Sequence, residues 1–325
     1  MKTIRCLLCL SAGSLVLAAA TATVAQQSYP SRPVRFVVSW SPGGAMDLIA
    51  RVVGPKLGEQ LGQQVVIDNR AGASGAIGTD LVAKSAPDGH TLLVGAVSEL
   101  VLNPMIVKVP YDPVRDFTAV SPLALEYYLL AVHPSLPARS VKDLIALAKA
   151  RPGEINYASG GTGSNLALVA ELFKSIAGIN MTHIPYKGGF PARQAVSSGE
   201  SQAMFASVSS TLPFVNSNRL VPLAVTSPKR SPLLPKVPTF AESGLRGMDA
   251  TSWYGLLAPA ATPREIIARL NAEIVKLGAT PDYRAQLEKL GYEPFTSSPE
   301  KFSAFMKTEL AIWGKVIKAA GIKPD

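Results

Sequence analysis

Three glycine-rich turns carry the residues of this sequence whose types and spacing suit the binding of an anion. They are Ser41-Pro42-Gly43-Gly44-Ala45-Met46-Asp47, Gly72-Ala73-Ser74-Gly75-Ala76-Ile77-Gly78 and Ser159-Gly160-Gly161-Thr162-Gly163-Ser164-Asn165. Each turn lies between a strand-like run and a helix-like run. A helix begins with unpaired backbone N–H groups at the positive end of its dipole, and nearby hydroxyls add further donors. We therefore expect the three turns to converge on one small anion.

Other kinds of chemistry are not indicated. The histidines His90, His133 and His183 lie far apart in the chain and lack metal-ligand spacing, so each is interpreted as structural. The sequence contains neither a G-x-S-x-G elbow nor a phosphate-binding P-loop, and the second turn lacks dinucleotide-motif spacing. Two carboxylates brought together only by the fold would escape this inspection. We therefore expect a binding protein without enzymatic activity, cofactor or metal.

The elements that must position the first two turns form a βαβαβ unit. Strand-like runs at 34–38, 64–68 and 91–94 alternate with helix-like runs at 47–61 and 77–86. Such a unit predicts a parallel sheet with ligand sites at the carboxyl ends of its strands. Pro55 inside the first helix predicts a kink or a break there.

A second unit of the same kind surrounds the third turn. Strands are expected at 128–133, 155–158, 182–184, 203–207 and 223–226, and helices at 140–150, 166–176 and 192–198. A strand at 253–258 returns to the first unit, and helices at 264–277, 282–290 and 299–320 end the chain. We therefore expect one discontinuous domain at 26–126 and 253–325, and a second domain at 127–252.

Composition and charge are consistent with a globular protein that binds small anions. The 325 residues are 47% hydrophobic and 17% charged, which is enough apolar material for two domains. The net charge is +9, and it becomes +7 when Lys2 and Arg5 are removed (9 − 2 = 7). The basic residues are scattered, so no nucleic-acid partner is expected. The net positive charge is expected to attract anionic ligands mildly.

The first 25 residues resemble a cleavable signal peptide. Lys2 and Arg5 precede a short apolar run, and small residues suit cleavage after Ala25, with Ala20-Thr21-Ala22 as a second candidate. A membrane-anchored N-terminus is the alternative, but the run is short for a membrane span. Both cysteines, Cys6 and Cys9, lie in this segment, so the mature chain has no disulfide. An exported protein without cysteine indicates the bacterial periplasm.

A series of short motifs resembles the Bug family, the extracytoplasmic solute receptors of tripartite tricarboxylate transporters. The motifs, in order, are Tyr29-Pro30-Ser31-Arg32-Pro33-Val34, Pro42-Gly43-Gly44, Asp68-Asn69-Arg70-Ala71-Gly72-Ala73, Pro87-Asp88-Gly89-His90-Thr91-Leu92, Gly161-Thr162-Gly163-Ser164, His183-Ile184-Pro185-Tyr186-Lys187-Gly188 and Trp253-Tyr254-Gly255. The similarity covers essentially the whole mature chain. It implies an α/β, type II-like periplasmic binding protein, with two domains around a cleft joined by hinge strands.

The resemblance also implies where a ligand carboxylate is held. Carried over to this chain, the contacts are Ser41, Gly43, Gly44, Ala73, Ser74, Ser159, Thr162, Gly163 and Ser164. Ser39-Trp40-Ser41 departs from the family's usual run before Pro-Gly-Gly. Phe190 follows Lys187-Gly188-Gly189, where smaller residues are common in the family. Gln202 stands where the family often has an aspartate. These departures concern the ligand rather than the fold.

Further candidates come from the residues themselves. Trp40 and Phe190 are candidates to clamp an aromatic or alkyl ligand, with core packing as the alternative. Asp47 either binds an ammonium group or caps its helix, which is the ordinary role of Asp there. Ser98 and Asn103, after the third strand, and Ser207, at a strand end, are candidates to enter the cleft, with turn and capping roles as alternatives for the first two.

The sequence thus predicts a monomeric periplasmic receptor that captures a small carboxylate by domain closure and delivers it to a membrane permease. An aromatic carboxylate or a dicarboxylate is the expected ligand. The alternatives are an exported hydrolase on the same scaffold and a ligand-sensing subunit of a membrane signalling system.

Overall fold

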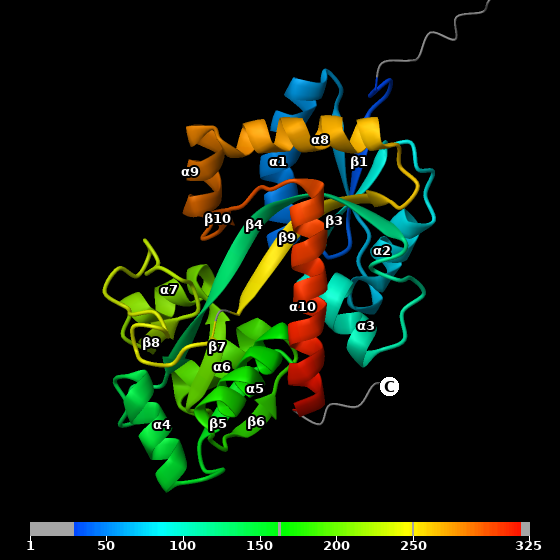
Figure 1. Ribbon diagram of the computed structural model, residues 1–325. Helices are drawn as coiled ribbons and strands as arrows, with labels where there is room; N and C mark the ends of the chain where they lie inside the picture. The colour runs from blue at the N-terminus through cyan, green and yellow to red at the C-terminus, as the bar shows by residue number, and fades with distance from the viewer. Residues whose placement is uncertain (1–28, 162–163, 249, 320–325) are drawn as a thin grey trace, which may run out of the picture.

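The computed structural model of the protein describes residues 29–161, 164–248 and 250–319 (Figure 1). Its strands are β1 (Val34–Val38), β2 (Val65–Asn69), β3 (Thr91–Ala96), β4 (Phe117–Val132), β5 (Asn156–Ser159), β6 (Thr182–Pro185), β7 (Ala203–Ser207), β8 (Val221–Val225), β9 (Thr251–Pro259) and β10 (Glu293–Pro294). Its α-helices are α1 (Ala45–Leu61), α2 (Ala76–Ala83), α3 (Asn103–Ile106), α4 (Val141–Ala150), α5 (Asn165–Ala177), α6 (Gly189–Ser198), α7 (Val208–Asn216), α8 (Arg264–Gly278), α9 (Pro281–Lys289) and α10 (Pro299–Ala319). A 3₁₀ turn, η1 (Ala73–Gly75), and a π-helical turn, η2 (Ser98–Leu102), complete the list.

The strands form two sheets that share β4. In the first sheet β1 pairs in parallel with β2 and β3, which confirms the βαβαβ unit, and β9 pairs antiparallel with both β3 and β4. In the second sheet β5 pairs in parallel with β6 and β7, while β4 pairs antiparallel with β7 and β8. We call the parts built on these sheets the first and second lobes. Their strands and helices give the chain the mixed α/β architecture expected from the sequence.

The hinge between the lobes is formed by β4 and β9. Figure 1 shows both strands running diagonally from the upper lobe to the lower one. Along β4, pairing with β9 ends at Tyr127 and pairing with β7 begins at Tyr128. The sequence located only the last five residues of β4, 128–132, because Pro122 and two register shifts interrupt the regular alternation before them. The domain boundaries expected at 126/127 and 252/253 stay a prediction.

Helix α1 continues through Pro55, where the sequence predicted a kink or a break. Its side chains Ile49, Val53 and Leu57 are fully buried in the core cluster beneath the first sheet. Burial of this apolar face outweighs the backbone hydrogen bond that a proline removes. The sequence also missed α3, α7 and β10, which are short, and the π turn η2.

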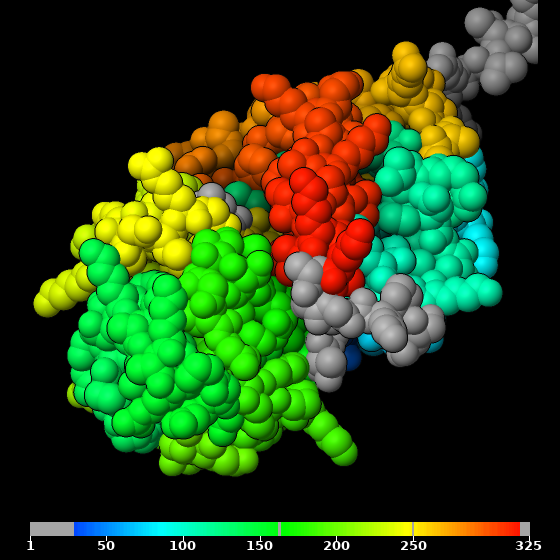
Figure 2. Space-filling model, turned by 60° about the horizontal axis from the view of Figure 1, so that its bottom comes forward, coloured from blue at the N-terminus to red at the C-terminus, as the bar shows by residue number. Residues whose placement is uncertain are grey.

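Helix α10 packs against both lobes. It contacts β4 and η2 and also α5, and the fully buried ring of Phe302 lies edge-on to Trp253 at 5.3 Å. Figure 2 shows α10 on the surface between the second lobe and the part of the first lobe that includes α3. None of the helices in the described residues is long and apolar enough for a membrane crossing.

Candidate ligand-binding cleft

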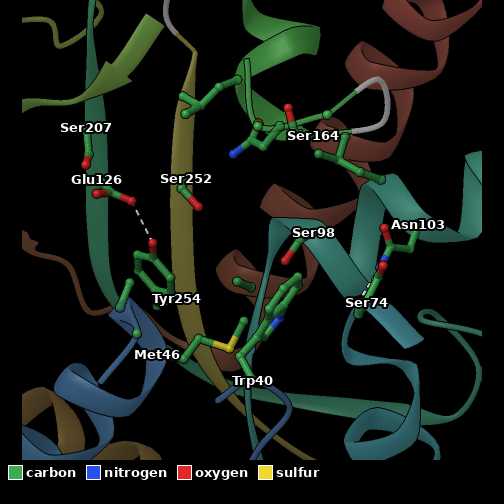
Figure 3. Close-up of a pocket in the computed structure, with 18 of the residues that line it drawn as sticks. Trp40, Met46, Ser74, Ser98, Asn103, Glu126, Ser164, Ser207, Ser252 and Tyr254 are labelled. Atoms are coloured by element: carbon green, nitrogen blue, oxygen red, sulfur yellow. Dashed lines mark hydrogen bonds between the residues drawn. The ribbon is translucent and has the colours of Figure 1, made fainter. Parts of the chain in front are cut away.

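A cavity of about 630 Å³ lies between the lobes, with the hinge strands at its back (Figure 3). Its size is in the range typical of small-molecule sites. Its lining residues are Trp40, Gly44, Ala45, Met46, Ser74, Ala96, Ser98, Leu102, Asn103, Ile106, Val107, Glu126, Tyr128, Gly160, Gly161, Ser164, Asn165, Leu166, Arg193, Ser207, Ser252 and Tyr254. The carboxyl ends of β1, β3 and β5 therefore open into one space, as the parallel strands predicted.

The first-lobe wall is organised by a buried carboxyl group, Glu99. Its carboxylate oxygens accept hydrogen bonds from Ser39 Oγ at 3.2 Å, the Ala96 N–H at 2.7 Å and Ser98 Oγ at 2.5 Å. The indole Nε1 of Trp40 donates to the same carboxyl at 3.3 Å. Burial raises the pKa of Glu99 despite these donors. The group fixes Trp40, which is 39% exposed and lies over the cavity rather than in the core.

The second glycine turn reaches the cavity through Ser74. Its backbone has a left-handed φ of 53°, which is uncommon for a serine. The amide Nδ2 of Asn103 donates to the Ser74 carbonyl at 2.6 Å, which ties this turn to α3. Ser98 begins the π turn η2, a type of irregular helix that is frequent at functional sites.

The back of the cavity is lined by polar groups on the hinge strands. Glu126 of β4 accepts a hydrogen bond from the Tyr254 hydroxyl of β9 at 2.7 Å, and Figure 3 shows both groups facing the cavity. Burial raises the pKa of Glu126 although hydrogen bonds from Tyr254 and Ser207 lower it. On the same face of β4, Tyr128 accepts a hydrogen bond from Asn165 of α5. This bond links the hinge to the second-lobe wall.

The second-lobe wall contributes the N-terminus of α5 and one cation. Ser164 is the N-cap of α5, and its side chain accepts the Ala167 N–H at 3.3 Å. Arg193 of α6 is half-buried, and its Nη1 donates to Ser210 Oγ at 3.2 Å. Its buried Nε has no hydrogen-bond partner among the described residues. Burial lowers the pKa of Arg193, but an arginine remains charged at neutral pH.

Six of the predicted contacts line this cavity, namely Trp40, Gly44, Ser74, Ser98, Ser164 and Ser207. Asn103, which the sequence had also raised as a candidate, lines it as well. Ser41, Gly43, Asp47, Ala73, Ser159 and Phe190 are not among the lining residues, and Thr162 and Gly163 lie outside the described residues. Ligand contact by all of these residues stays a prediction.

Asp47 serves its own turn instead of facing the cavity. Its side chain is 2% exposed, and one carboxylate oxygen accepts from the Gly43 N–H and from Arg51 Nε, both at 2.9 Å. The N-cap residue of α1 is Gly44, so Asp47 is in the first turn and reaches back past the cap. Burial raises its pKa, but the hydrogen bonds from Arg51 and Gly43 outweigh burial and lower it overall.

Ser159 and Phe190 also have partners of their own. The Ser159 hydroxyl is within 2.6 Å of His183 Nε2 and accepts the Gly161 N–H at 3.2 Å, so it closes the third turn. His183 stacks on Tyr157 at 4.7 Å, consistent with its structural interpretation. Phe190 is 60% exposed, which contradicts the alternative of core packing, and the Arg193 guanidinium lies 5.9 Å from its ring centroid.

Sequence inspection missed several charged and polar side chains of the cavity, above all Arg193, Glu126, Tyr128 and Tyr254. A signal existed on the hinge strands. Glu126-Tyr127-Tyr128 and Ser252-Trp253-Tyr254 place polar side chains at alternate positions of otherwise apolar strands. Period-2 alternation puts such side chains on one face. Arg193 had no comparable signal: it falls within the helix expected at 192–198, and a helical pattern does not show which side chain reaches a cleft.

The described residues contain no group of three or more His, Cys, Asp or Glu side chains that is arranged to hold a metal ion. The cleft instead offers hydroxyl and amide donors, one carboxyl group and one guanidinium. Such a set suits reversible binding of a polar small molecule with an anionic group.

Comparison with known proteins gives the same assignment. The family model described as "Tripartite tricarboxylate transporter family receptor" matches residues 49–322. The "UPF0065 protein in tcbD-tcbE intergenic region" of Pseudomonas sp. (strain P51) is 40% identical over 309 residues, which cover 94% of this chain and 92% of that protein.

Solved structures agree in fold as well as in sequence. The structure titled "R. palustris Rpa4515 with adipate" has a TM-score of 0.79 and 38% identity, and the match covers 91% of this chain and 100% of that one. "MatC (Rpa3494) from Rhodopseudomonas palustris with bound malate" has a TM-score of 0.73 and 29% identity, covering 89% and 100%. The expected type II-like periplasmic binding fold is thereby confirmed. The chain belongs to the receptor family of the tripartite tricarboxylate transporters.

Proposed function

We propose that this receptor captures a small carboxylate in the cleft, closes around it and delivers it to a membrane permease. The observation that carries the proposal is Arg193, a cation on the cavity wall without a carboxylate partner among the described residues. A half-buried guanidinium with a free donor is expected to bind an anionic ligand group by charge-assisted hydrogen bonds. The two similar structures whose titles name adipate and malate support this ligand class.

The remainder of the ligand has an apolar surface to cover. Trp40, Met46 and Ile106 of the first lobe and Leu166 of the second lobe line the same cavity. The exposed Trp40 ring offers a large rigid contact to an aromatic or alkyl body. An aromatic carboxylate or a dicarboxylate fits this combination of an anion seat and an apolar wall.

Closure of the two lobes is expected because both lobes contribute residues to the cavity wall. Trp40, Ser74 and Ser98 belong to the first lobe, while Ser164 and Arg193 belong to the second. A ligand that contacts both sets binds most tightly when the lobes approach, so binding shifts the population toward a closed state. The closed state is then the form that a permease distinguishes from the empty receptor.

The remaining parts of the proposal concern location and activity. The family is one of transporter receptors, and the first 28 residues, which include the expected signal peptide, lie outside the described ones. We place the mature chain in the periplasm as a monomer, and we assign it ligand capture without turnover.

The test is a ligand screen followed by a matched pair of arginine variants. Thermal shift over aromatic acids, dicarboxylates and amino acids identifies ligands, and calorimetry then compares R193Q with R219Q. Arg219 is a close control, because its guanidinium lies 5.2 Å from the Phe214 ring centroid and donates to Ser197 Oγ, yet it does not line the cavity.

R193Q is expected to lower carboxylate affinity by about 10- to 100-fold, since a hydrogen bond to a charged group contributes about 1.5–3 kcal/mol. R219Q is expected to leave the affinity unchanged. Equal losses in both variants, or a panel without any binding acid, would contradict the proposal. Release of a product from a bound acid, ester or amide would contradict the assignment of capture without turnover.

A further inference from the structure

Glu126 is the only carboxyl group among the described residues that line the cleft. It lies on β4, opposite Ser252 of β9, at the hinge between the lobes. Its neighbour Tyr127 lines a separate cavity on the opposite side of the hinge strand, as the alternation of strand side chains requires. Glu126 therefore faces the ligand space, and Figure 3 shows its carboxyl group beside Tyr254 there.

The groups around Glu126 are neutral donors. Tyr128 lies on its own strand, Tyr254 on β9 donates at 2.7 Å, and Tyr292 precedes β10 and packs edge-on against Tyr254 at 5.7 Å. Burial raises the pKa of all three phenols, so they remain protonated at neutral pH. Arg193 is the one cation among the described lining residues. No ion pair joins it to Glu126, but two serines link them: Ser207 hydrogen-bonds to Glu126 and to Ser210, and Ser210 accepts from Arg193. The cleft therefore has a basic group on one wall and an acidic group at its back.

We propose that Glu126 is a specificity-determining residue that accepts a hydrogen bond from a second polar group of the ligand, at the end opposite the carboxylate that Arg193 holds. The donor is a hydroxyl, an ammonium or an undissociated carboxyl group. This inference rests on the proposed function, because it assumes that Arg193 holds the first carboxylate. It divides the ligands into two classes. Hydroxy and amino acids bind in their ordinary ionisation state, whereas dicarboxylates bind only when one proton is shared with Glu126.

A second carboxylate at this end would meet Glu126 as a like charge in a half-buried site. Two carboxyl groups that share such a site titrate as a pair, and one proton is held between them. A hydroxy acid needs no such proton. The affinity for a dicarboxylate therefore falls as the pH rises, while the affinity for the matching hydroxy acid does not.

The experiment uses two matched sets of probes with the full mature receptor. The linear set is adipate, 6-hydroxyhexanoate and hexanoate, and the aromatic set is terephthalate, 4-hydroxybenzoate and benzoate. Calorimetry from about pH 6 to about pH 8 covers a range in which the free probe carboxyl groups are ionised and the phenol is still protonated. In the wild type, the hydroxy acid of the binding set is expected to exceed the plain acid by about tenfold, and the dicarboxylate alone weakens with rising pH.

The variant E126Q keeps the shape of the side chain and replaces a carboxylate oxygen by an amide donor. It is expected to shift the affinity ratio by about tenfold toward the dicarboxylate and to remove the pH dependence. E293Q is the control, because Glu293 pairs with Leu125 of the same strand but is exposed and lines the opposite cavity. It is expected to change neither quantity.

The outcomes separate this inference from the proposed function. If a probe set binds but E126Q leaves both the ratio and the pH dependence at wild-type values, Glu126 does not determine specificity and only this inference fails. If E126Q does not fold, a wild-type dicarboxylate affinity that is constant with pH overturns the inference by itself. Failure of both sets to bind the wild type overturns the proposed function together with it.

Discussion

The turns at Ser41–Asp47 and Ser159–Asn165 each connect a parallel strand to a helix, β1 to α1 and β5 to α5. They differ in whether a carboxylate of the protein itself occupies the start of the helix. In the first turn the buried carboxylate of Asp47 accepts the Gly43 N–H and pairs with Arg51. In the second lobe the turn is closed by a neutral hydroxyl, Ser159. Arg193, a cation that lines the same cavity, has no carboxylate partner among the described residues. The first turn supplies its own anion, whereas Arg193 in the second lobe is proposed to pair with the carboxylate of a ligand.

The comparison shows what a strand–glycine–helix pattern can and cannot indicate. The pattern identifies free N–H groups at a helix start. Whether those groups remain available depends on side chains that the fold brings to them, such as an aspartate one turn into the same helix. Such a pattern therefore indicates an anion-binding site only when no carboxylate of the protein itself already accepts from the free N–H groups.

Among the variants that test this comparison, D47A is expected to lower the free energy of unfolding the most. The change removes a charged hydrogen bond to the turn and leaves Arg51 without its partner, although that guanidinium is 55% exposed and remains hydrated. We expect a loss of about 2 kcal/mol in the free energy of unfolding, measured by urea denaturation. Ligand affinity is expected to change less than in R193Q. The reverse pattern, a stable D47A protein that no longer binds, would mean that the first turn holds the ligand.

D80A is the control for this prediction. Asp80 and Lys84 form a pair with the same helical spacing, and the Lys84 side chain is 67% exposed. An exposed pair of this kind contributes about 0.5 kcal/mol. A D80A protein as unstable as D47A would show that the burial of Asp47 gives it no special role.

The pH dependence of the free energy of unfolding should also show the contribution of Asp47. Burial raises the pKa of Asp47, but the hydrogen bonds from Arg51 and Gly43 outweigh it and lower the folded pKa below the unfolded value. The stabilisation is therefore complete above the unfolded pKa of about 3.9 and is lost as the pH falls through the folded value. The difference in unfolding free energy between wild type and D47N should be constant near neutrality and shrink below about pH 4. A difference that grows in acid would refute the assignment.

The smallest effect is expected for S164A, compared with S140A. Both serines cap a helix by accepting a backbone N–H, from Ala167 and from Asp143 respectively, but only Ser164 lines the cleft. Each change should lower the free energy of unfolding by about 1 kcal/mol. S164A should in addition weaken ligand binding by about threefold, the loss of one neutral hydrogen bond. Equal affinities in the two variants, measured by calorimetry, would restrict Ser164 to capping.

The sequence predicted most strands and helices, because their apolar periodicity and their turns agree with the final structure. The helix expected at 140–150, for example, is α4, and Ser140 caps it by accepting the Asp143 N–H. Residues 117–127 of β4 were missed, since Pro122 and two register shifts disturb their pattern. Local rules describe regular elements well and irregular strands poorly.

The cleft could be predicted where it is built from residues that end or follow a strand. Trp40, Gly44, Ser74, Ser98, Ser164 and Ser207 occupy such positions, and the topology brings them together. Glu126 and Arg193 meet the cavity through long-range pairing of β4 with β9 and through the orientation of α6, which no local pattern specifies. The same holds for Asp47, whose partner Gly43 determines that it turns away from the ligand space.

The position of β9 in the first sheet has a consequence for the order in which the chain folds. This strand separates β3 from β4, and Leu93 is paired with Leu257, beyond the whole second lobe in the chain. The second sheet needs only residues from β4 to β8. Because long-range pairings form slowly, we expect the second lobe to gain structure first and the first lobe to wait for the last quarter of the chain. Pulse-labelled hydrogen exchange should accordingly protect the amides of β7 before those of β3, and the opposite order would refute this expectation.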